Sequence, residues 1–139
     1  LPNTPALVNF GNVLGMGSGQ GVIKIKMAYI GGILSVNRYK WGRFTKPEVK
    51  QWMQDLAWAT KLMKGEWVFQ TPINIELSGQ FKDNRSKPDL HNISKCICDA
   101  VSKGIGINDK HFEVSVKEPT VDKKVEQPYL QIIIYFLTI

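Results

Sequence analysis

The sequence is poor in cysteine and contains no long hydrophobic run. Its two thiols, Cys96 and Cys98, would point about 200° apart on a helix, so they cannot form a disulfide with each other. Reduced thiols favour a cytoplasmic protein. No apolar stretch reaches the ~20 residues that a membrane-spanning helix requires, so we expect no membrane segment. A zinc site built from both cysteines with His91 and His111 is disfavoured, because the two thiolates diverge.

The composition is that of an ordinary globular domain. The chain has 139 residues, of which 43% are hydrophobic and 22% charged, enough for one apolar core. Lys and Arg outnumber Asp and Glu by 18 to 12, giving a net charge of +6. This excess favours a polyanionic partner such as nucleic acid, but it is too modest to identify one by itself.

Two parts of the chain differ in composition. Residues 1–20 are rich in glycine and contain no lysine or arginine, which predicts a flexible N-terminal arm. Residues 21–139 contain no internal repeat and no long linker, so we expect them to form a single domain.

Hydrophobic periodicity predicts two helices and four strands in the order strand, helix, strand, helix, strand, strand. The first helix begins at Thr45, whose T-x-x-E spacing to Glu48 forms a capping box, and ends at Gly65. The other expected elements are strands over 22–30, 72–81, 112–117 and 129–139 and a second helix over 92–103. The order predicts an α/β (α+β) fold, a mixed sheet with two main helices packed on it. The apolar last strand is expected to lie in the sheet interior or at a subunit contact.

Polar residues gather on and around the second expected helix. One face carries Asn92, Lys95, Asp99 and Ser102, spaced three, four and three residues apart. Asp89 and His91 precede this helix, and Asp109 follows a glycine turn that can bring it back to the same face.

Carboxylates converging beside a lysine suit chemistry on a phosphodiester. A divalent metal bound by the carboxylates would polarise the phosphoryl oxygen and activate water, while the lysine would offset charge developing on the phosphate. The alternative is a solvated helix face, on which Lys95 and Asp99 form an ordinary surface ion pair. Spacing alone leaves both interpretations open.

The segment "PDLHNISKCICDAVSKGIGINDKHF" resembles the signature of the RusA family of Holliday-junction resolvases. That signature is D-x-D-N-x-x-K, followed by an aspartate four residues after the lysine and by an Asp-Asp pair beyond a glycine turn. The matching positions are Asp89, Asn92, Lys95, Asp99 and Asp109. The segment "SVNRYKWGRF" resembles the family's N-terminal loop more weakly, at Ser35, Asn37, Arg38 and Arg43.

The resemblance implies a small homodimeric, Mg²⁺-dependent endonuclease that resolves four-way DNA junctions by symmetric nicks. It implies that Asp89 and Asp109 are metal ligands, that Lys95 contacts the scissile phosphate, and that Asp99 supports the lysine or the metal. Two symmetric cuts would require two sites related by a two-fold axis. Expected phosphate contacts come from Asn37, Arg38, Lys40, Arg43, Lys87 and Lys95.

Two positions depart from the family pattern. His91 stands where the family has its second carboxylate, and Asn108 replaces the first member of the Asp-Asp pair. As a neutral nitrogen ligand, His91 is better suited to Mn²⁺ or Zn²⁺ than to Mg²⁺, and it could instead act as the general base. The alternative is that His91 only caps or packs against the start of the helix.

Two further questions stay open at the level of sequence. Tyr39 and Trp41 either stack on bases exposed at a junction or anchor the basic loop to the core. The rival functions are a catalytically weakened branched-DNA-binding protein and an unrelated interaction module. Both the nuclease and the weakened binding protein predict salt-dependent junction binding, but only the nuclease needs Asp89 and Asp109 for turnover.

Overall fold

The computed structural model describes residues 7–14, 19–41 and 44–139, with one mixed β-sheet at its centre. The sheet order is β1-β2-β8-β5-β6, and short β7 pairs with the end of β5. Strands β1, β2, β8 and β5 are antiparallel neighbours, whereas β6 and β7 run parallel to β5. The strands are β1 Leu7–Leu14, β2 Gln20–Ala28, β5 Ile73–Phe81, β6 Phe112–Val116, β7 Thr120–Val121 and β8 Tyr129–Leu137.

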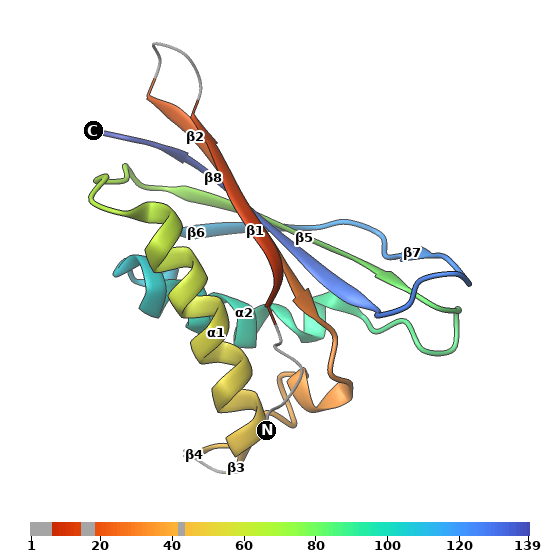
Figure 1. Cartoon of the computed structure of the whole chain (residues 1–139). Coiled ribbons are helices and arrows are strands. Elements are labelled where there is room, and N and C mark those ends of the chain that lie inside the picture. Colours follow the sequence, from red (N-terminus) through yellow and green to blue (C-terminus); the bar gives the residue numbers. More distant parts are fainter. Residues whose placement is uncertain (1–6, 15–18, 42–43) are drawn as a thin grey trace.

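Both long helices lie on the same side of the sheet (Figure 1). They are α1, Pro47–Lys64, and α2, Ser94–Ile105. A small hairpin of β3, Lys40–Trp41, and β4, Phe44–Thr45, precedes α1. Three short 3₁₀ helices complete the elements: η1 Gly32–Leu34, η2 Leu90–Asn92 and η3 Asp109–His111. Neither long helix combines the length and apolarity needed to span a bilayer, within the described ranges.

The core lies between the helices and the sheet. Strand β5 alternates, so Ile73, Ile75 and Leu77 are buried beneath the helices while the residues between them face the other side of the sheet. Fully burying such a side chain stabilises the fold by about 1.5–3 kcal/mol. Trp52 of α1 is buried and donates from Nε1 to the Ala28 carbonyl at 2.8 Å, which ties this helix to β2.

The predicted fold class, a mixed sheet with two main helices, is confirmed. The apolar C-terminal segment forms β8, which lies between β2 and β5 in the sheet interior, as one of the two expectations had it. Gly65 ends α1 as predicted; its φ of 57° is accessible to glycine at little cost. The prediction that Thr45 begins α1 with a capping box is wrong. Thr45 pairs with Lys40 in the hairpin, and Lys46 takes the N-cap position of α1 without a side-chain hydrogen bond.

The predicted N-terminal arm over residues 1–20 differs from the structure at 7–14. These residues form β1, which pairs with β2 along its whole length, from Leu7 opposite Met27 to Leu14 opposite Gly21. The segment is rich in apolar and β-branched residues, and pairing satisfies the backbone groups that β2 would otherwise expose. Residues 1–6 and 15–18 of the predicted arm lie outside the described residues.

Candidate active site

Helix α2 is the crossover between the parallel strands β5 and β6, and the whole motif lies on it or at its two ends. At its C-terminal end Gly106 adopts the left-handed conformation, with φ 72°, and its N–H donates to the Ser102 carbonyl. The Ser102 hydroxyl donates to the Ile107 carbonyl at 2.7 Å. This turn returns the chain along the helix and places Asp109 beside Lys95.

The lysine cluster consists of Lys95, Asp99 and Asp109. The Lys95 ammonium lies 3.0 Å from Asp99 Oδ1 and 3.6 Å from Asp109 Oδ2. Tyr39 donates its hydroxyl proton to the other Asp99 oxygen, Oδ2, at 2.7 Å. The three side chains of the cluster therefore converge as the spacing predicted, and a fourth residue from a distant segment holds Asp99.

The electrostatics of the lysine cluster keep Lys95 cationic. The hydrogen bond to Asp99 and the charges of Asp99 and Asp109 raise the pKa of Lys95, against a smaller opposing effect of burial. Because 53% of the lysine side chain is exposed, its ion pair with Asp99 contributes only about 0.3–0.5 kcal/mol to stability. The lysine cluster therefore contributes little to the stability of the fold, and its main consequence is that it holds the Lys95 ammonium in one position.

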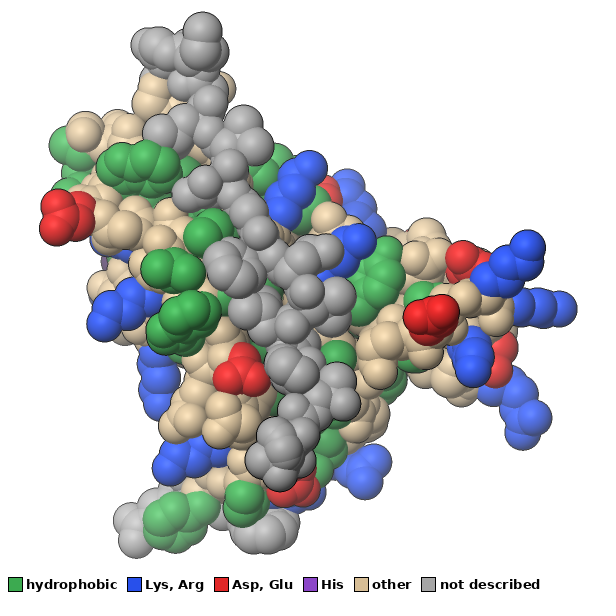
Figure 2. All heavy atoms as spheres, in the orientation of Figure 1, with side chains coloured by type: hydrophobic (Ala, Val, Ile, Leu, Met, Phe, Trp, Pro, Cys, Tyr) green, Lys and Arg blue, Asp and Glu red, His purple; other side chains and the backbone are tan. Residues whose placement is uncertain are grey.

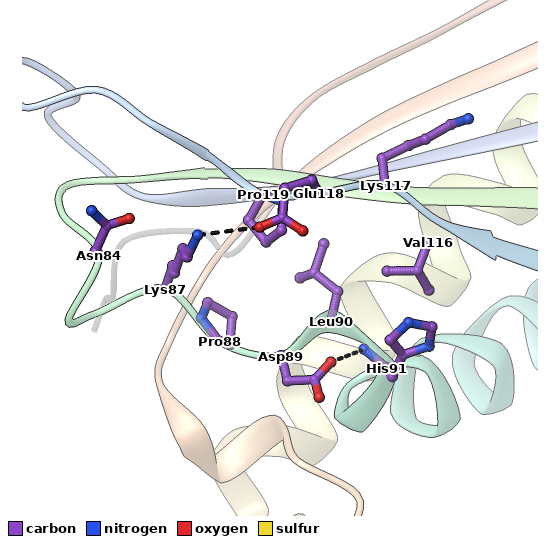
Figure 3. A pocket seen from close by; sticks show the side chains of 10 residues that line it. All are labelled: Asn84, Lys87, Pro88, Asp89, Leu90, His91, Val116, Lys117, Glu118 and Pro119. Carbon is purple, nitrogen blue, oxygen red and sulfur yellow. Dashed lines mark hydrogen bonds and ion pairs between the residues drawn. The ribbon is translucent and has the colours of Figure 1, made fainter.

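Asp89 and His91 lie in the turn just before the start of α2 and line a cavity there, which we call the turn cavity. Asp89 caps η2 and accepts a hydrogen bond on Oδ1 from the His91 backbone N–H at 3.0 Å. Both side chains line a cavity of about 360 Å³, together with Lys87, Lys117 and Glu118 (Figure 3). Lys87 Nζ pairs with Glu118 Oε1 at 3.2 Å across it.

The predicted metal ligands are divided between two cavities. Asp89 and His91 line the turn cavity, whereas Asp109 lines a second cavity of about 410 Å³ with Lys95, Asp99 and Lys40. In the part of the chain that the structure describes, no three His, Cys, Asp or Glu side chains are grouped so that they could hold a metal ion. The set Asp89, His91 and Asp109 is therefore not brought together as one site, and metal binding by it stays a prediction.

The cysteines belong to the interior. Cys96 and Cys98 are both buried and free, and Cys96 packs within the core as the helix stripe predicted. Burial, assisted by the charge of Asp99, raises the pKa of the Cys96 thiol to about 12. Burial also raises the pKa of Cys98 to about 11, so both remain protonated at neutral pH.

The segment 35–44, which we call the basic segment, contains three predicted DNA-contact residues that the structure describes, and they lie near α2. Asn37, Arg38 and Lys40 are exposed, and Lys40 lines the cavity of the lysine cluster. The Val36 N–H donates to the Asn92 carbonyl at 2.6 Å, which fixes the segment against the start of the helix region. Arg43 lies outside the described residues.

A second group of cations was not part of the predicted contact set. Figure 2 shows Lys and Arg side chains around the end of the molecule where β7 lies. Exposed cations in the loops at this end are Lys82, Arg85, Lys123 and Lys124. The turn cavity adjoins these loops through Lys87 and Lys117, so basic side chains extend beyond the motif on this side.

Tyr39 makes a contact with the lysine cluster that the sequence did not predict. Its side chain is 2% exposed, which leaves no face for stacking on a base and matches the alternative of an anchored loop. Trp41, the other residue considered for stacking, has a side chain outside the described set. Because Tyr39 and Asp99 are sixty positions apart, no local spacing indicates their contact.

Comparisons with known proteins support the family indicated by the motif. The sequence matches the family model described as endodeoxyribonuclease RusA over residues 35–135. Among solved structures, 2C-methyl-D-erythritol 2,4-cyclodiphosphate synthase from Plasmodium vivax matches with 16% identity and a TM-score of 0.38, covering 65% of this chain and 57% of that one. An IspF–CDP complex from Plasmodium falciparum matches with 19% identity and a TM-score of 0.36, covering 65% and 55%. The chain thus spans little more than half of each, and no curated protein matches.

Proposed function

The chain belongs to the RusA family of endodeoxyribonucleases, and on that premise we propose that it resolves four-way DNA junctions by paired, metal-dependent nicks. The observation that carries the proposal is the lysine cluster. A cation held beside two carboxylates, on a cavity that Lys40 also lines, is suited to receive a phosphodiester. The match extends from residue 35 to residue 135, so it covers both the basic segment and the motif.

The proposed binding step relies on the backbone of the DNA rather than on its bases. Phosphate contacts position a duplex and carry no direct sequence information, whereas the shape of a branch can be read through its geometry. The exposure of the basic segment and its place beside α2 support this assignment. The proposed contacts are Asn37, Arg38, Lys40, Arg43, Lys87 and Lys95.

Lys95 is the residue that we assign to the scissile phosphate. Like any lysine its ammonium is charged at neutral pH, and its raised pKa extends the charged range upward, so it can offset negative charge as the attacking oxygen adds to phosphorus. Asp99 is engaged through both oxygens, by Lys95 and by Tyr39, which suits it to support the lysine. Asp109 uses one oxygen in its contact with Lys95.

Two ways of holding Mg²⁺ with Asp89 and Asp109 can be compared with the structure, and only one of them fits. An ion held by Asp89, His91 and Asp109 at once does not fit the arrangement of the described residues. An ion held by one or two carboxylates, with substrate phosphates and water, does fit, because Mg²⁺ commonly binds in this way. We assign this role separately to Asp109 in the lysine cluster and to Asp89 in the turn cavity, where His91 is a nitrogen ligand better suited to Mn²⁺ or the general base. When bound, the metal would polarise the phosphoryl oxygen and acidify the attacking water.

We further propose that the active form is a homodimer. Nicks at symmetric positions on two strands of a junction need two active sites related by a two-fold axis. A monomer would instead release nicked junctions and cut the second strand in an independent encounter.

The alternative function is a branched-DNA-binding protein whose cleavage is weakened. Two observations favour it: the His91 side chain stands in place of a carboxylate, and the described residues contain no preformed group of three metal ligands. Such a protein would still bind junctions through its exposed cations.

Cleavage of a labelled synthetic four-way junction separates the two functions. Wild type and Asp109→Asn are compared in Mg²⁺ and, separately, in Mn²⁺. Paired symmetric nicks that disappear in Asp109→Asn are the expected result. Tight junction binding without nicks in either metal would reject the nuclease and leave the binding protein.

A further inference from the structure

We propose that Tyr39 is a positioning residue that fixes the Lys95 ammonium through Asp99; this inference rests on the proposed nuclease function. The geometry is a chain of contacts from a buried hydroxyl to an exposed cation. Tyr39 Oη lies 2.7 Å from Asp99 Oδ2, and Asp99 Oδ1 lies 3.0 Å from Lys95 Nζ. Asp109 Oδ2 completes the chain at 3.6 Å from the same nitrogen.

Asp99 needs an external restraint because a carboxylate turns readily about its last torsion. With a different partner on each oxygen, the plane of the Asp99 carboxylate is fixed. Lys95 depends on that plane, since its side chain is 53% exposed and a free lysine samples many rotamers. Without Tyr39 the carboxylate can turn, and the ammonium loses a fixed position over the cavity.

Tyr39 is itself held firmly. Its side chain is buried, its N–H donates to the Ser35 carbonyl at 3.1 Å, and its carbonyl accepts from Lys46 N–H at 3.0 Å. Burial, and secondarily the hydrogen bond to Asp99, raises the pKa of the Tyr39 hydroxyl, which therefore stays protonated and remains the donor. The direction of the hydrogen bond is consequently constant across the pH range of a nuclease assay.

The same residue connects the basic segment to the lysine cluster. Lys40 Nζ lies 5.4 Å from the centroid of the Tyr39 ring, and Lys40 lines the cavity that contains Lys95. The Val36–Asn92 backbone contact holds the segment at a second point. DNA bound by Arg38 and Lys40 is thereby kept in register with Lys95, which gives the tyrosine a role in orientation rather than in affinity.

The test compares Tyr39→Phe with Tyr129→Phe, which also removes a single hydroxyl. The control tyrosine donates to Gln80 Oε1 at 2.8 Å, away from α2. We expect Tyr39→Phe to lower the single-turnover cleavage rate about 10- to 100-fold, in line with the cost of a small misplacement of a reacting group. Junction Kd, measured without metal, should change less than about twofold, because a neutral hydroxyl that makes no phosphate contact is lost. Tyr129→Phe should retain the wild-type rate.

A second variant identifies the route of the effect. Asp99→Ala lies on a helix at a partly exposed position, so it is expected to fold even if Tyr39→Phe does not. If Tyr39 acts through Asp99, the double variant Tyr39→Phe/Asp99→Ala cleaves no more slowly than Asp99→Ala alone. A further loss in the double variant, or a wild-type rate in Tyr39→Phe, would overturn the proposal.

A readout independent of cleavage keeps this inference separate from the proposed function. The ¹⁵N–¹H NMR signal of the Lys95 ammonium reports whether the group is fixed or freely rotating. We expect the signal to shift toward that of a free lysine in Tyr39→Phe and to stay unchanged in Tyr129→Phe. An unchanged signal in Tyr39→Phe would reject the positioning role, whereas a wild-type protein that binds but never nicks junctions would reject only the nuclease.

Discussion

The motif has two parts, the lysine cluster on one face of α2 and the turn cavity just before the start of that helix, and they are built differently. In the lysine cluster, side chains contact side chains: Lys95 meets Asp99 and Asp109, and Tyr39 holds Asp99. In the turn cavity, Asp89 contacts the backbone N–H of His91, which leaves the imidazole exposed. The first region has a restrained geometry, while the second presents exposed side chains beside Lys87, Lys117 and Glu118.

This difference indicates that the lysine cluster and the turn cavity have different roles in the proposed reaction. A restrained cation is suited to a transition-state role, because preorganised charge needs no rearrangement during the reaction. Exposed donors with an open cavity are suited to ligands that arrive with the substrate, such as a hydrated metal bound to phosphate. The predictions below test this difference in roles, from the largest expected effect to the smallest.

Asp109→Asn should have the largest effect. The substitution keeps the size of the side chain but removes the charge shared with Lys95 and proposed for the metal. We expect single-turnover cleavage to fall by about 10³-fold or more, because binding of the metal that polarises the phosphoryl oxygen would be weakened and Lys95 would lose one of its carboxylate partners. Asp55→Asn on α1, where the carboxylate accepts only from Gln51 in the contacts described, is the matched control and should cleave as wild type does. Equal rates for both variants would contradict the assignment.

Lys95→Gln should come next, with a loss of about 10²–10³-fold in the cleavage rate, because a preorganised positive charge is removed. The reduction should appear in the rate at saturating enzyme and only weakly in junction Kd. Lys50→Gln, an exposed lysine of α1, controls for the change in net charge. A variant that binds junctions tenfold more weakly yet cleaves them at the normal rate would make Lys95 a simple phosphate contact.

The lysine cluster was also the part of the site most open to prediction from sequence. Residues four apart on a helix lie on one face, so the Lys95–Asp99 pair follows from the spacing alone. The alternation in β5 likewise predicts which of its residues are buried. These inferences succeed because periodicity within one element determines which side chains are neighbours.

Contacts between elements could not be derived in the same way. The Tyr39 hydroxyl and Asp99 are sixty positions apart, so their contact depends on the tertiary structure and not on the periodicity of one element. Thr45 has the sequence of a helix cap, but its pairing with Lys40 places it in a strand. Asp89 and His91 lie in the turn before α2, whereas Asp109 follows that helix, so closeness in the sequence to the motif did not ensure a common cavity.

His91→Asp tests the turn cavity by restoring the carboxylate of the family pattern. Carboxylate oxygen is preferred by Mg²⁺ over imidazole nitrogen, so the substitution should shift the ratio of Mg²⁺- to Mn²⁺-supported rates by about tenfold toward Mg²⁺. The measurement is a metal titration of the cleavage rate for each ion. His91→Ala is the companion variant, because a general base would be lost from it in both metals alike. An unchanged ratio in His91→Asp, together with a wild-type rate in His91→Ala, would leave the histidine as a helix-start residue without metal contact.

Lys87→Gln should have a smaller effect, confined to binding. Lys87 borders the turn cavity and is paired with Glu118, so part of its charge is already offset. Loss of one phosphate contact should reduce the slope of log Kd against log salt by about one and weaken binding uniformly across junction sequences. Lys61→Gln in the last turn of α1 is the control. Identical salt slopes for the two variants would remove Lys87 from the DNA-contact surface.

The smallest effect concerns stability at high pH. Because the folded-state pKa of Lys95 is raised above its ordinary value of 10.5, its ion pairs stabilise the fold fully below that pH and are lost as pH rises through the folded pKa. The contribution should be only about 0.3–0.5 kcal/mol, because the lysine is half exposed. The difference in unfolding free energy between wild type and Lys95→Gln should therefore be small near neutrality and vanish in strong alkali. A difference of several kcal/mol in the free energy of unfolding would mean that the lysine cluster is a structural ion-pair network. Its contrast with the turn cavity would then reflect stability rather than catalysis.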